Sequence, residues 1–365
     1  MKKAKRFTVV EMAGTHYEMG RQYGLQCKEL IRRLVQDFEG LILEAKNIQR
    51  GREVAHEAVA HVRECAPELL EEVEGIASGA GVDFEDVFRI NCSVELFAWQ
   101  GCLQGVDVST VPRECSSFAA RAKEGPLAAW NMDWWRLWLP YIVLLKGRPK
   151  QGPRFLAFAF AGCVGRPGMG EHLALGANYL PYRNGREPGG KNPTWEGPGV
   201  PYNFFSRMLL KQPSTKEALR LIASVRRMAS VNYTLADKHG SICCVETTPR
   251  DYDVLPAPEG FIVHANSYHS PKFGGIPEDK QKEQDPRAYH ARQLFRERRG
   301  HLDRHAIVAI QTSHFPGKTT GICVHQPLQN RDGITLLSFI ADVAAGTMWA
   351  ACGPPCEHEF LPYEL

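Results

Sequence analysis

A cysteine and an aspartate in the middle of the chain are the residues whose types and spacing best suit chemistry. Cys115 opens the run Cys-Ser-Ser-Phe-Ala-Ala, and Asp133 lies in a later run that ends in Asn-Met-Asp-Trp. If the two runs form neighbouring strands joined by a short turn, Asp133 returns towards Cys115. A carboxylate beside a thiol and an amine can orient both groups, so the pattern predicts nucleophilic catalysis at Cys115.

The competing interpretation of these two residues is structural. A free cysteine is most often a small buried hydrophobic residue, and a single aspartate more often serves a turn or a helix cap than a reaction. The chain has eleven cysteines, so any one of them is a weak candidate by itself. Position favours Cys115, because it lies where two parts of the chain with different character meet.

The part before Cys115 is expected to be helical. Apolar residues recur at spacings of three and four over residues 17–98, Pro67 is expected to break this pattern, and Asp83 is expected to cap a later helix. From about residue 104 the chain has turn-forming residues and no apolar stripe. We therefore expect a helical leader over residues 1–114 that ends in an exposed linker.

The part after Cys115 combines strands and helices. Strands are expected at residues 116–122, 127–134, 155–161, 173–179, 231–236, 244–247, 260–265, 321–325, 334–340 and 348–351. Helices are expected to begin at Ser214, Asp285 and Asp303, which are residue types that cap helix N-termini. The stretch 182–202 is rich in Gly, Pro and Asn and is expected to be a long surface loop. Residues 115–365 are thus predicted to form an α+β catalytic body.

Composition excludes several classes of protein. Of 365 residues, 44% are hydrophobic and 23% are charged, which is typical of a globular protein with a sizeable core. A net charge of +3 does not indicate a nucleic-acid partner. The apolar run Phe7–Val10 is too short for a signal peptide, and no run approaches the roughly 18 apolar residues of a membrane span. We expect a cytoplasmic protein without a membrane partner, and leave open whether it forms a homo-oligomer.

The cysteines and histidines do not show the spacing of a metal site. Eleven scattered cysteines favour free thiols in a reducing compartment. No Cys-x-x-Cys occurs, and Cys352 and Cys356 have no set of His or Cys partners nearby. His264 and His269 are expected to be satisfied strand histidines, and Glu246 to cap a structural hydrogen-bond network. We therefore predict neither a metal nor an organic cofactor.

Several motifs along the chain point to one family when they are taken together. They are Gly14-Thr-His-Tyr-Glu-Met-Gly-Arg-Gln-Tyr-Gly24, Cys-Ser-Ser at 115–117, Asn131-Met-Asp-Trp134, Leu175-Gly-Ala-Asn-Tyr179, residues 231–237 leading to Val245-Glu246, and His264-Ala-Asn-Ser267. With these motifs the chain resembles the acyl-CoA:6-aminopenicillanate acyltransferase (isopenicillin N acyltransferase-like) family. It is similar, more distantly, to penicillin V acylase and the conjugated bile-acid hydrolases. All of these are N-terminal-nucleophile hydrolases.

The resemblance implies a fold, a processing step and roles for individual residues. The fold is an αββα sandwich, and the chain cuts itself between Glu114 and Cys115. Cys115 is then the nucleophile, Asp133 orients its new amino group, Asn178 donates to the oxyanion, and Asn266 holds the site together. The cleaved leader is expected to remain bound to the body as its partner.

The sequence departs from the family pattern at a few positions. Glu114 stands before the nucleophile where the fungal penicillin enzyme has glycine, which bears on the rate of self-cleavage. Trp130 stands where the bile-acid hydrolases have an arginine, which argues against bile-acid-like substrates. Trp130 and Trp134 either fill the core between the sheets or form an apolar wall for the substrate, and both interpretations stay open.

The residues support a complete reaction. An α-amino group has a pKa of about 7.7–8.0, so the amine of a processed Cys115 can accept the thiol proton near neutral pH. The thiolate then attacks an amide or thioester carbonyl, and the acyl-enzyme passes its acyl group to water or to an amine. We predict such an enzyme, acting on a small non-protein substrate. The alternatives are an unprocessed, catalytically silent binding protein on the same scaffold and a papain-like cysteine hydrolase.

Overall fold

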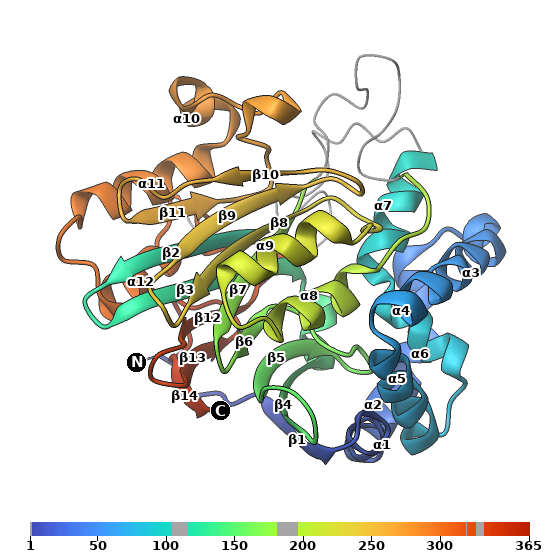
Figure 1. Ribbon diagram of the computed structural model, residues 1–365. Coiled ribbons are helices and arrows are strands. Elements are labelled where there is room, and N and C mark those ends of the chain that lie inside the picture. The colour runs from blue at the N-terminus through green and yellow to red at the C-terminus, as the bar shows by residue number, and fades with distance from the viewer. Residues whose placement is uncertain (1, 104–114, 181–195, 319, 326–331) are drawn as a thin grey trace.

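The computed structural model of the chain describes residues 2–103, 115–180, 196–318, 320–325 and 332–365. Two β-sheets lie face to face, and helices cover the outer face of each sheet (Figure 1). The helices of the first hundred residues pack at one side of this sandwich. Glu114, the expected linker and most of the expected loop at 182–202 lie outside the described residues.

The N-terminal part contains seven α-helices within its described residues. They are α1 (His16–Gln26), α2 (Lys28–Ile42), α3 (Ile48–Glu57), α4 (Val59–Cys65), α5 (Pro67–Ala80), α6 (Phe84–Asn91) and α7 (Ser93–Leu103). The break expected at Pro67 is confirmed: α4 ends at Cys65 and α5 begins with the proline, which is tolerated in the first turn of a helix. No helix in the described part of the chain is both long enough and apolar enough to cross a bilayer.

Glycines let two of these helices touch at their backbones. α1 carries Gly20 and Gly24, and α5 faces them with Gly75. A Cβ atom at Gly20 would overlap the backbone carbonyl oxygen of Glu72, and one at Gly75 would overlap a backbone carbonyl oxygen of α1. This close contact gives a packing reason for the glycines of the motif at residues 14–24.

The strands form two sheets. The first has the order β1-β4-β5-β6-β7-β8-β9-β10 and the second has the order β11-β2-β3-β12-β13-β14. The strands are β1 (Thr8–Gly14), β2 (Cys115–Ala122), β3 (Gly125–Trp135), β4 (Ile142–Pro149), β5 (Phe155–Phe160), β6 (Gly168–Gly170), β7 (Leu173–Tyr179), β8 (Val231–Asp237), β9 (Ile242–Thr247), β10 (Tyr252–Leu255), β11 (Phe261–His264), β12 (Gly333–Asp342), β13 (Thr347–Cys352) and β14 (Leu361–Glu364). β2 and β3 are antiparallel neighbours with Cys115 opposite Met132, so the predicted hairpin is confirmed.

Helices complete a four-layer arrangement. α8 (Tyr202–Leu210) and α9 (Thr215–Ser224) cover the first sheet, while α11 (Pro286–Glu297) and α12 (Arg304–Gln311) cover the second. The short α10 (Gln281–Gln284) precedes α11. Between the sheets, a Cβ atom at Gly176 of β7 would lie 2.9 Å from the Ser117 Cβ of β2, so the glycine permits close packing there. The order helix, sheet, sheet, helix is the expected αββα sandwich.

Two expectations about strands need correction. The leader is not wholly helical, because Thr8–Gly14 forms β1 at the edge of the first sheet and pairs in parallel with β4. The apolar run Phe7–Val10 is therefore mostly part of a strand of the body's sheet. The strand expected at residues 321–325 is also wrong: that segment makes an isolated bridge between His314 and Gly321 and scattered backbone hydrogen bonds, among them one from the Thr335 N–H to the Val324 carbonyl, but it does not form a strand.

Candidate active site

Cys115 is the first residue of β2 and is partly exposed. Its backbone N–H donates to Oδ1 of Asn266 at 2.8 Å, and its carbonyl oxygen accepts from Nη1 of Arg287 at 3.2 Å. These two partners lie 151 and 172 residues further along the chain. The main chain of the proposed nucleophile is therefore held from two sides by distant parts of the fold.

Asn266 follows β11 and bridges the two sheets. While its Oδ1 atom accepts from Cys115, its Nδ2 atom donates to the carbonyl oxygen of Tyr179 at the end of β7, at 2.8 Å. The side chain is buried. The structure thus places Asn266 beside Cys115 with both ends of its amide in use, and its assigned role in holding the site together stays a prediction.

Asp133 lies on β3 and is fully buried. Its Oδ2 atom accepts from Arg287 Nη1 at 3.1 Å, and its Oδ1 atom accepts from the Thr335 hydroxyl at 2.5 Å. Burial raises the pKa of Asp133 to about 7, although Arg287 and Thr335 both favour the ionised form. Arg287 touches both Asp133 and the carbonyl of Cys115, so it links the two residues. That Asp133 orients the amino group of Cys115 stays a prediction.

Sequence analysis did not identify Arg287 or Thr335. Arg287 lies in the first turn of α11, directly after the capping residue Asp285 and Pro286. A cation in the first turn of a helix is disfavoured by the helix dipole, so an arginine there implies an anionic partner elsewhere. That was a usable signal. Thr335 gave none, because only the pairing of β12 with β3 brings it opposite Asp133.

Asn178 lies on β7 within a buried polar cluster. Its Nδ2 atom lies 2.8 Å from Ser117 Oγ, 2.9 Å from Asn232 Oδ1 and 3.2 Å from the carbonyl oxygen of His264. An amide nitrogen carries two hydrogens, and these buried acceptors already occupy them. Asn178 is also absent from the described residues that line the pocket beside Cys115. Its oxyanion role stays a prediction, and this placement favours a bracing role between strands instead.

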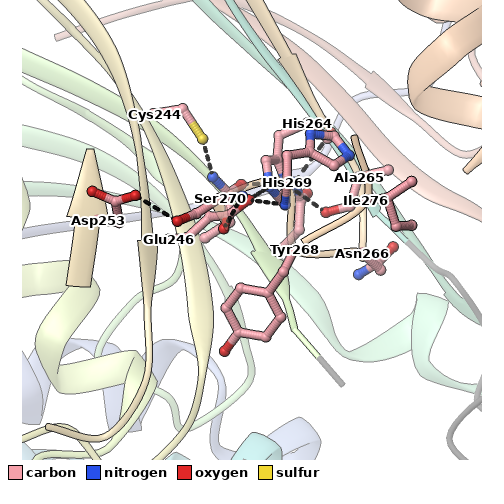
Figure 2. Close-up of polar contacts among 12 residues, drawn as sticks. Cys244, Glu246, Asp253, His264, Ala265, Asn266, Tyr268, His269, Ser270 and Ile276 are labelled. Atoms are coloured by element: carbon pink, nitrogen blue, oxygen red, sulfur yellow. Dashed lines mark hydrogen bonds and ion pairs between the residues drawn. The ribbon is translucent and has the colours of Figure 1, made fainter. Parts of the chain in front are cut away.

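A buried carboxylate fixes the segment that carries Asn266 (Figure 2). Glu246 on β9 accepts from His264 Nε2 at 2.8 Å, from the His269 backbone N–H at 2.6 Å and from the Ser270 backbone N–H at 3.0 Å. The expected hydrogen-bond network around Glu246 is therefore confirmed. Because three donors meet at one carboxylate, the turn after β11 is held in place beside the first residue of β2.

The same three side chains have donor atoms that could hold a metal ion. The ligand atoms of Glu246, His264 and His269 lie within 4.8 Å of one another. Each is already satisfied, however, since His264 pairs with Glu246 and His269 Nε2 lies 3.1 Å from Asp285 Oδ2. This arrangement fits a structural network better than a metal site.

A mainly apolar pocket opens beside Cys115. Its described lining residues are Ile42, Ser93, Val94, Phe97, Cys115, Trp130, Met132, Asp133, Trp134, Trp138, Phe160, Arg166, Ala177, Tyr179, Tyr202 and Val231. Trp130 is buried, whereas Trp134 is partly exposed and packs edge-on against Phe97 at 5.2 Å. These tryptophans both fill the core and line the pocket. Since Phe97 belongs to α7, the leader and the body form the pocket together.

Arg166 is the cationic side chain among the described lining residues. Its guanidinium carbon lies 4.3 Å from the centre of the Phe160 ring, and Nη2 donates to Ser93 Oγ at 3.1 Å. Burial raises the pKa of the neighbouring Glu95 to about 7. An arginine held beside aromatic rings can bind an anionic or carbonyl group of a ligand. Sequence analysis did not identify Arg166, which lies in an irregular segment between β5 and β6.

The arrangement of sheets and helices is that of a known fold class. The αββα sandwich is the fold of N-terminal-nucleophile hydrolases, and Cys115 occupies the first position of a central strand in it. Residues 192–355 match the profile of the family described as acyl-coenzyme A:6-aminopenicillanic acid acyl-transferase. The resemblance predicted from the sequence is thereby confirmed. The matched segment begins after Cys115 and Asp133, so it does not bear on either residue.

Similar proteins are found among characterised sequences and solved structures. The chain is 23% identical over 304 residues to the β-alanyl-dopamine/carcinine hydrolase of Drosophila melanogaster, covering 74% of this chain and 73% of that protein. A conjugated bile acid hydrolase from Clostridium perfringens aligns with a TM-score of 0.43 at 13% identity, over 69% of this chain and 97% of that one. Penicillin V acylase from Agrobacterium tumefaciens aligns with a TM-score of 0.38 at 13% identity, over 65% and 83%. The family match and the Drosophila relative support an enzyme of the hydrolase or acyltransferase type.

Proposed function

We propose that this chain is a self-processing cysteine enzyme that cleaves an amide bond of a small molecule through an acyl-enzyme on Cys115. The observation that carries the proposal is the setting of Cys115. Its main chain is held by Asn266 and Arg287, and the residue lines an apolar pocket that it shares with the buried Asp133. The family match and the Drosophila relative support hydrolase or acyltransferase chemistry.

In the proposed self-cleavage, the sulfur of Cys115 attacks the carbonyl carbon of Glu114. The peptide C–N bond breaks, the acyl group moves to sulfur, and the nitrogen takes up the thiol proton to become an amine. Water then hydrolyses the thioester, which leaves Glu114 with a carboxylate and Cys115 as a new N-terminus. Oδ1 of Asn266 already accepts a hydrogen bond from this nitrogen and is placed to hold the amine that replaces the amide.

In the proposed turnover, the free amine of Cys115 takes the thiol proton. An α-amine with a pKa of about 7.7–8.0 suits this step near neutral pH. The thiolate adds to the substrate carbonyl, the leaving amine takes a proton from the ammonium of Cys115, and an acyl-enzyme remains. Water converts the acyl-enzyme to a carboxylic acid, whereas an amine acceptor converts it to a new amide. In its ionised form, Asp133 orients the ammonium group of Cys115 by electrostatic attraction. Arg287 assists because it contacts both Asp133 and the carbonyl oxygen of Cys115.

The pocket suggests the class of substrate. We propose a small non-protein amide with an aromatic or apolar group that packs against Trp130, Trp134 and Phe97, and with a polar group near Arg166. The Drosophila relative is named for β-alanyl-dopamine and carcinine, which supports a small amide with an aromatic part. An acyl thioester is the alternative donor, since it forms the same acyl-enzyme.

The processed enzyme is proposed to consist of a leader, residues 1–114, and a catalytic body, residues 115–365, that stay together. Contacts between the two parts support this. Tyr23 of α1 accepts a hydrogen bond from the Gly162 N–H at 2.8 Å, and Glu72 of α5 forms a buried ion pair with Arg207 of α8 at 3.3 Å. The leader also supplies Phe97 to the pocket wall, so the body alone lacks part of its substrate site.

Intact mass measurement and N-terminal sequencing test the proposal. The wild-type chain should yield two fragments, Met1–Glu114 and Cys115–Leu365, the second beginning Cys-Ser-Ser. Cys115→Ala should stay uncut and should release no acyl product from small aromatic amides. Cys115→Ser, which keeps a much weaker nucleophile, should be cut partially and turn over poorly. If the wild-type chain stays intact but is active, self-processing is ruled out and the rest of the proposal stands. If the Cys115→Ala variant is active, Cys115 is not the nucleophile.

A further inference from the structure

A second cluster of chemically reactive side chains lies outside the active site. His314, Cys323, His325 and Cys356 each place one donor atom within 4.8 Å of the other three. His314 follows α12, Cys323 and His325 precede β12, and Cys356 lies between β13 and β14. The fold therefore gathers two thiols and two imidazoles from three separate segments.

The distances within this cluster suit a single ion at its centre. Nε2 of His325 lies 2.8 Å from Cys356 Sγ and 3.4 Å from Cys323 Sγ. In a tetrahedral zinc site, bonds of about 2.3 Å to sulfur and about 2.0–2.1 Å to nitrogen place neighbouring ligand atoms about 3.3–3.8 Å apart. The four donor atoms reach that spacing by moving about 1 Å or less.

Two features of the histidines point independently to a metal. Nε2 of His314 is buried and has no hydrogen-bond partner among the described residues, which is costly for a polar atom unless a ligand uses it. Its ring lies 5.3 Å from that of His325. The opposite nitrogen of His325, Nδ1, lies 3.5 Å from Glu357 Oε1. A carboxylate behind a histidine is the arrangement that orients metal-binding imidazoles.

We propose that His314, Cys323, His325 and Cys356 bind one Zn²⁺ ion. Two thiolates and two imidazoles in a tetrahedral set select zinc over harder cations. Each cysteine releases its proton to solvent on binding, and the two thiolates then balance the charge of the ion. Four protein ligands fill the coordination shell, so the ion is structural and has no open position for water or substrate.

The sequence predicted no metal site because Cys356 has no set of His or Cys partners nearby along the chain, and the zinc proposal departs from that prediction. The partners of Cys356 lie at residues 314–325 and reach it only through the fold. A disulfide between Cys323 and Cys356 is the competing chemistry. It leaves both imidazoles without a role and requires an oxidant, whereas zinc uses all four donors.

The ion is placed to stiffen one wall of the active site. Val324 lies between two of the ligands, and its N–H donates to Thr335 Oγ1 at 2.9 Å while its carbonyl accepts from the Thr335 N–H at 3.0 Å. Thr335 in turn donates to Asp133. Zinc bound by Cys323 and His325 therefore fixes Val324, which lies between them. Val324 in turn holds Thr335, the hydrogen-bond partner of Asp133.

Metal analysis of the full chain tests the proposal. Protein purified from zinc-supplemented medium should contain about one zinc per chain by elemental mass spectrometry. After chelation under reducing conditions, added Co²⁺ should give the intense visible bands of a tetrahedral thiolate site, and Zn²⁺ should abolish them. Cys356→Ser and His314→Gln should weaken zinc binding by more than about 100-fold, and Glu357→Gln by about tenfold. Cys352→Ser removes a buried thiol outside the cluster and should bind zinc as the wild type does.

Three outcomes would overturn the zinc proposal. These outcomes are a folded, reduced chain that gives no cobalt bands, zinc binding that survives both ligand substitutions, and a chain that is two mass units light because Cys323 and Cys356 are joined. If a ligand variant does not fold, the cobalt titration of the wild-type chain still decides. Loss of self-cleavage or turnover does not bear on this test, because its readouts are metal content and absorption.

Discussion

At the scale of single residues, two side-chain contacts fix the backbone of Cys115 at the start of β2. Asn266 holds the nitrogen, Arg287 holds the carbonyl, and both side chains are themselves held, by Tyr179 and by Asp133. A nucleophile whose main chain is fixed before reaction loses little further freedom in reaching the substrate. The same nitrogen contact serves the uncut amide and the amine that replaces it, so one arrangement suits both proposed reactions.

The titration of Asp133 gives a prediction for the pH dependence of turnover. If ionised Asp133 is needed, activity rises as the pH increases through its pKa of about 7. The Thr335 hydroxyl lowers that pKa by stabilising the carboxylate. Thr335→Val removes this bond, so the acidic limb of the kcat/KM profile should move up by about one pH unit. Thr335→Ser keeps the hydroxyl and should leave the limb where it is. An unmoved limb in Thr335→Val would assign it to another group.

Asn178 gives a prediction that separates two roles. Its amide satisfies buried acceptors at Ser117, Asn232 and His264, so Asn178→Ala should lower the free energy of unfolding by about 1–3 kcal/mol. Turnover per folded molecule should then change little. If Asn178 instead donates to the oxyanion, turnover falls by about 10²–10³-fold and stability changes less. Urea unfolding and an acyl-release assay on the same preparation distinguish these results.

The sequence predicts the site only where local signals exist. The pairing of β2 with β3 follows from two strand patterns and a turn, and the structure confirms it. The resemblance supplied Asn266, which lies against Cys115. Thr335 and Arg166 carry no such signal, because each acquires its partner through contacts between segments far apart in the sequence. Arg287 carries only an indirect signal, which is its position as a cation in the first turn of α11.

At the scale of elements, the predictions hold where one segment determines its own structure. The helix starts at Ser214, Asp285 and Asp303 are confirmed, since each side chain accepts from a backbone N–H of the first turn. β1 and β4 were not predicted. β1 becomes a strand only by pairing with β4, and β4 is buried along most of its length, so it lacks the alternation of a half-exposed strand.

The buried ion pair between α5 and α8 gives a prediction about stability. Glu72 and Arg207 are both buried and paired, and Glu72 also contacts His16 at 2.8 Å. Glu72→Gln leaves Arg207 buried without its counter-charge, so the free energy of unfolding should fall by about 3–5 kcal/mol. Glu68 of α5 pairs with Lys211, the residue that follows α8, at a partly exposed position, so Glu68→Gln should cost less than about 1 kcal/mol. Urea titrations in an uncut Cys115→Ala background make this comparison, and equal losses would contradict it.

At the scale of the whole molecule, the leader (residues 1–114) is integrated into the fold, since it contributes a strand to the first sheet and side chains to the pocket. β1 completes the first sheet, buried contacts join the helices to the body, and Phe97 and Val94 line the pocket. A cut before Cys115 therefore need not release the leader. The two fragments are expected to elute together on size exclusion under reducing, non-denaturing conditions.

The shared pocket gives a last prediction, about substrate affinity. Phe97 of the leader packs against Trp134 and Tyr179 of the body, so Phe97→Ala opens the apolar wall without touching Cys115. The loss of an aromatic contact with the substrate should raise KM for a small aromatic amide by about tenfold, equivalent to about 1.4 kcal/mol. Self-cleavage should proceed as in the wild type, because the proposed reaction between the Cys115 sulfur and the Glu114 carbonyl does not depend on the aromatic wall of the pocket. Phe84→Ala makes the same truncation on α6, where the ring stacks on Phe88 and does not line the pocket, and it should leave KM unchanged. If both variants have wild-type KM values, the leader does not contact the substrate, and the site belongs to the body alone.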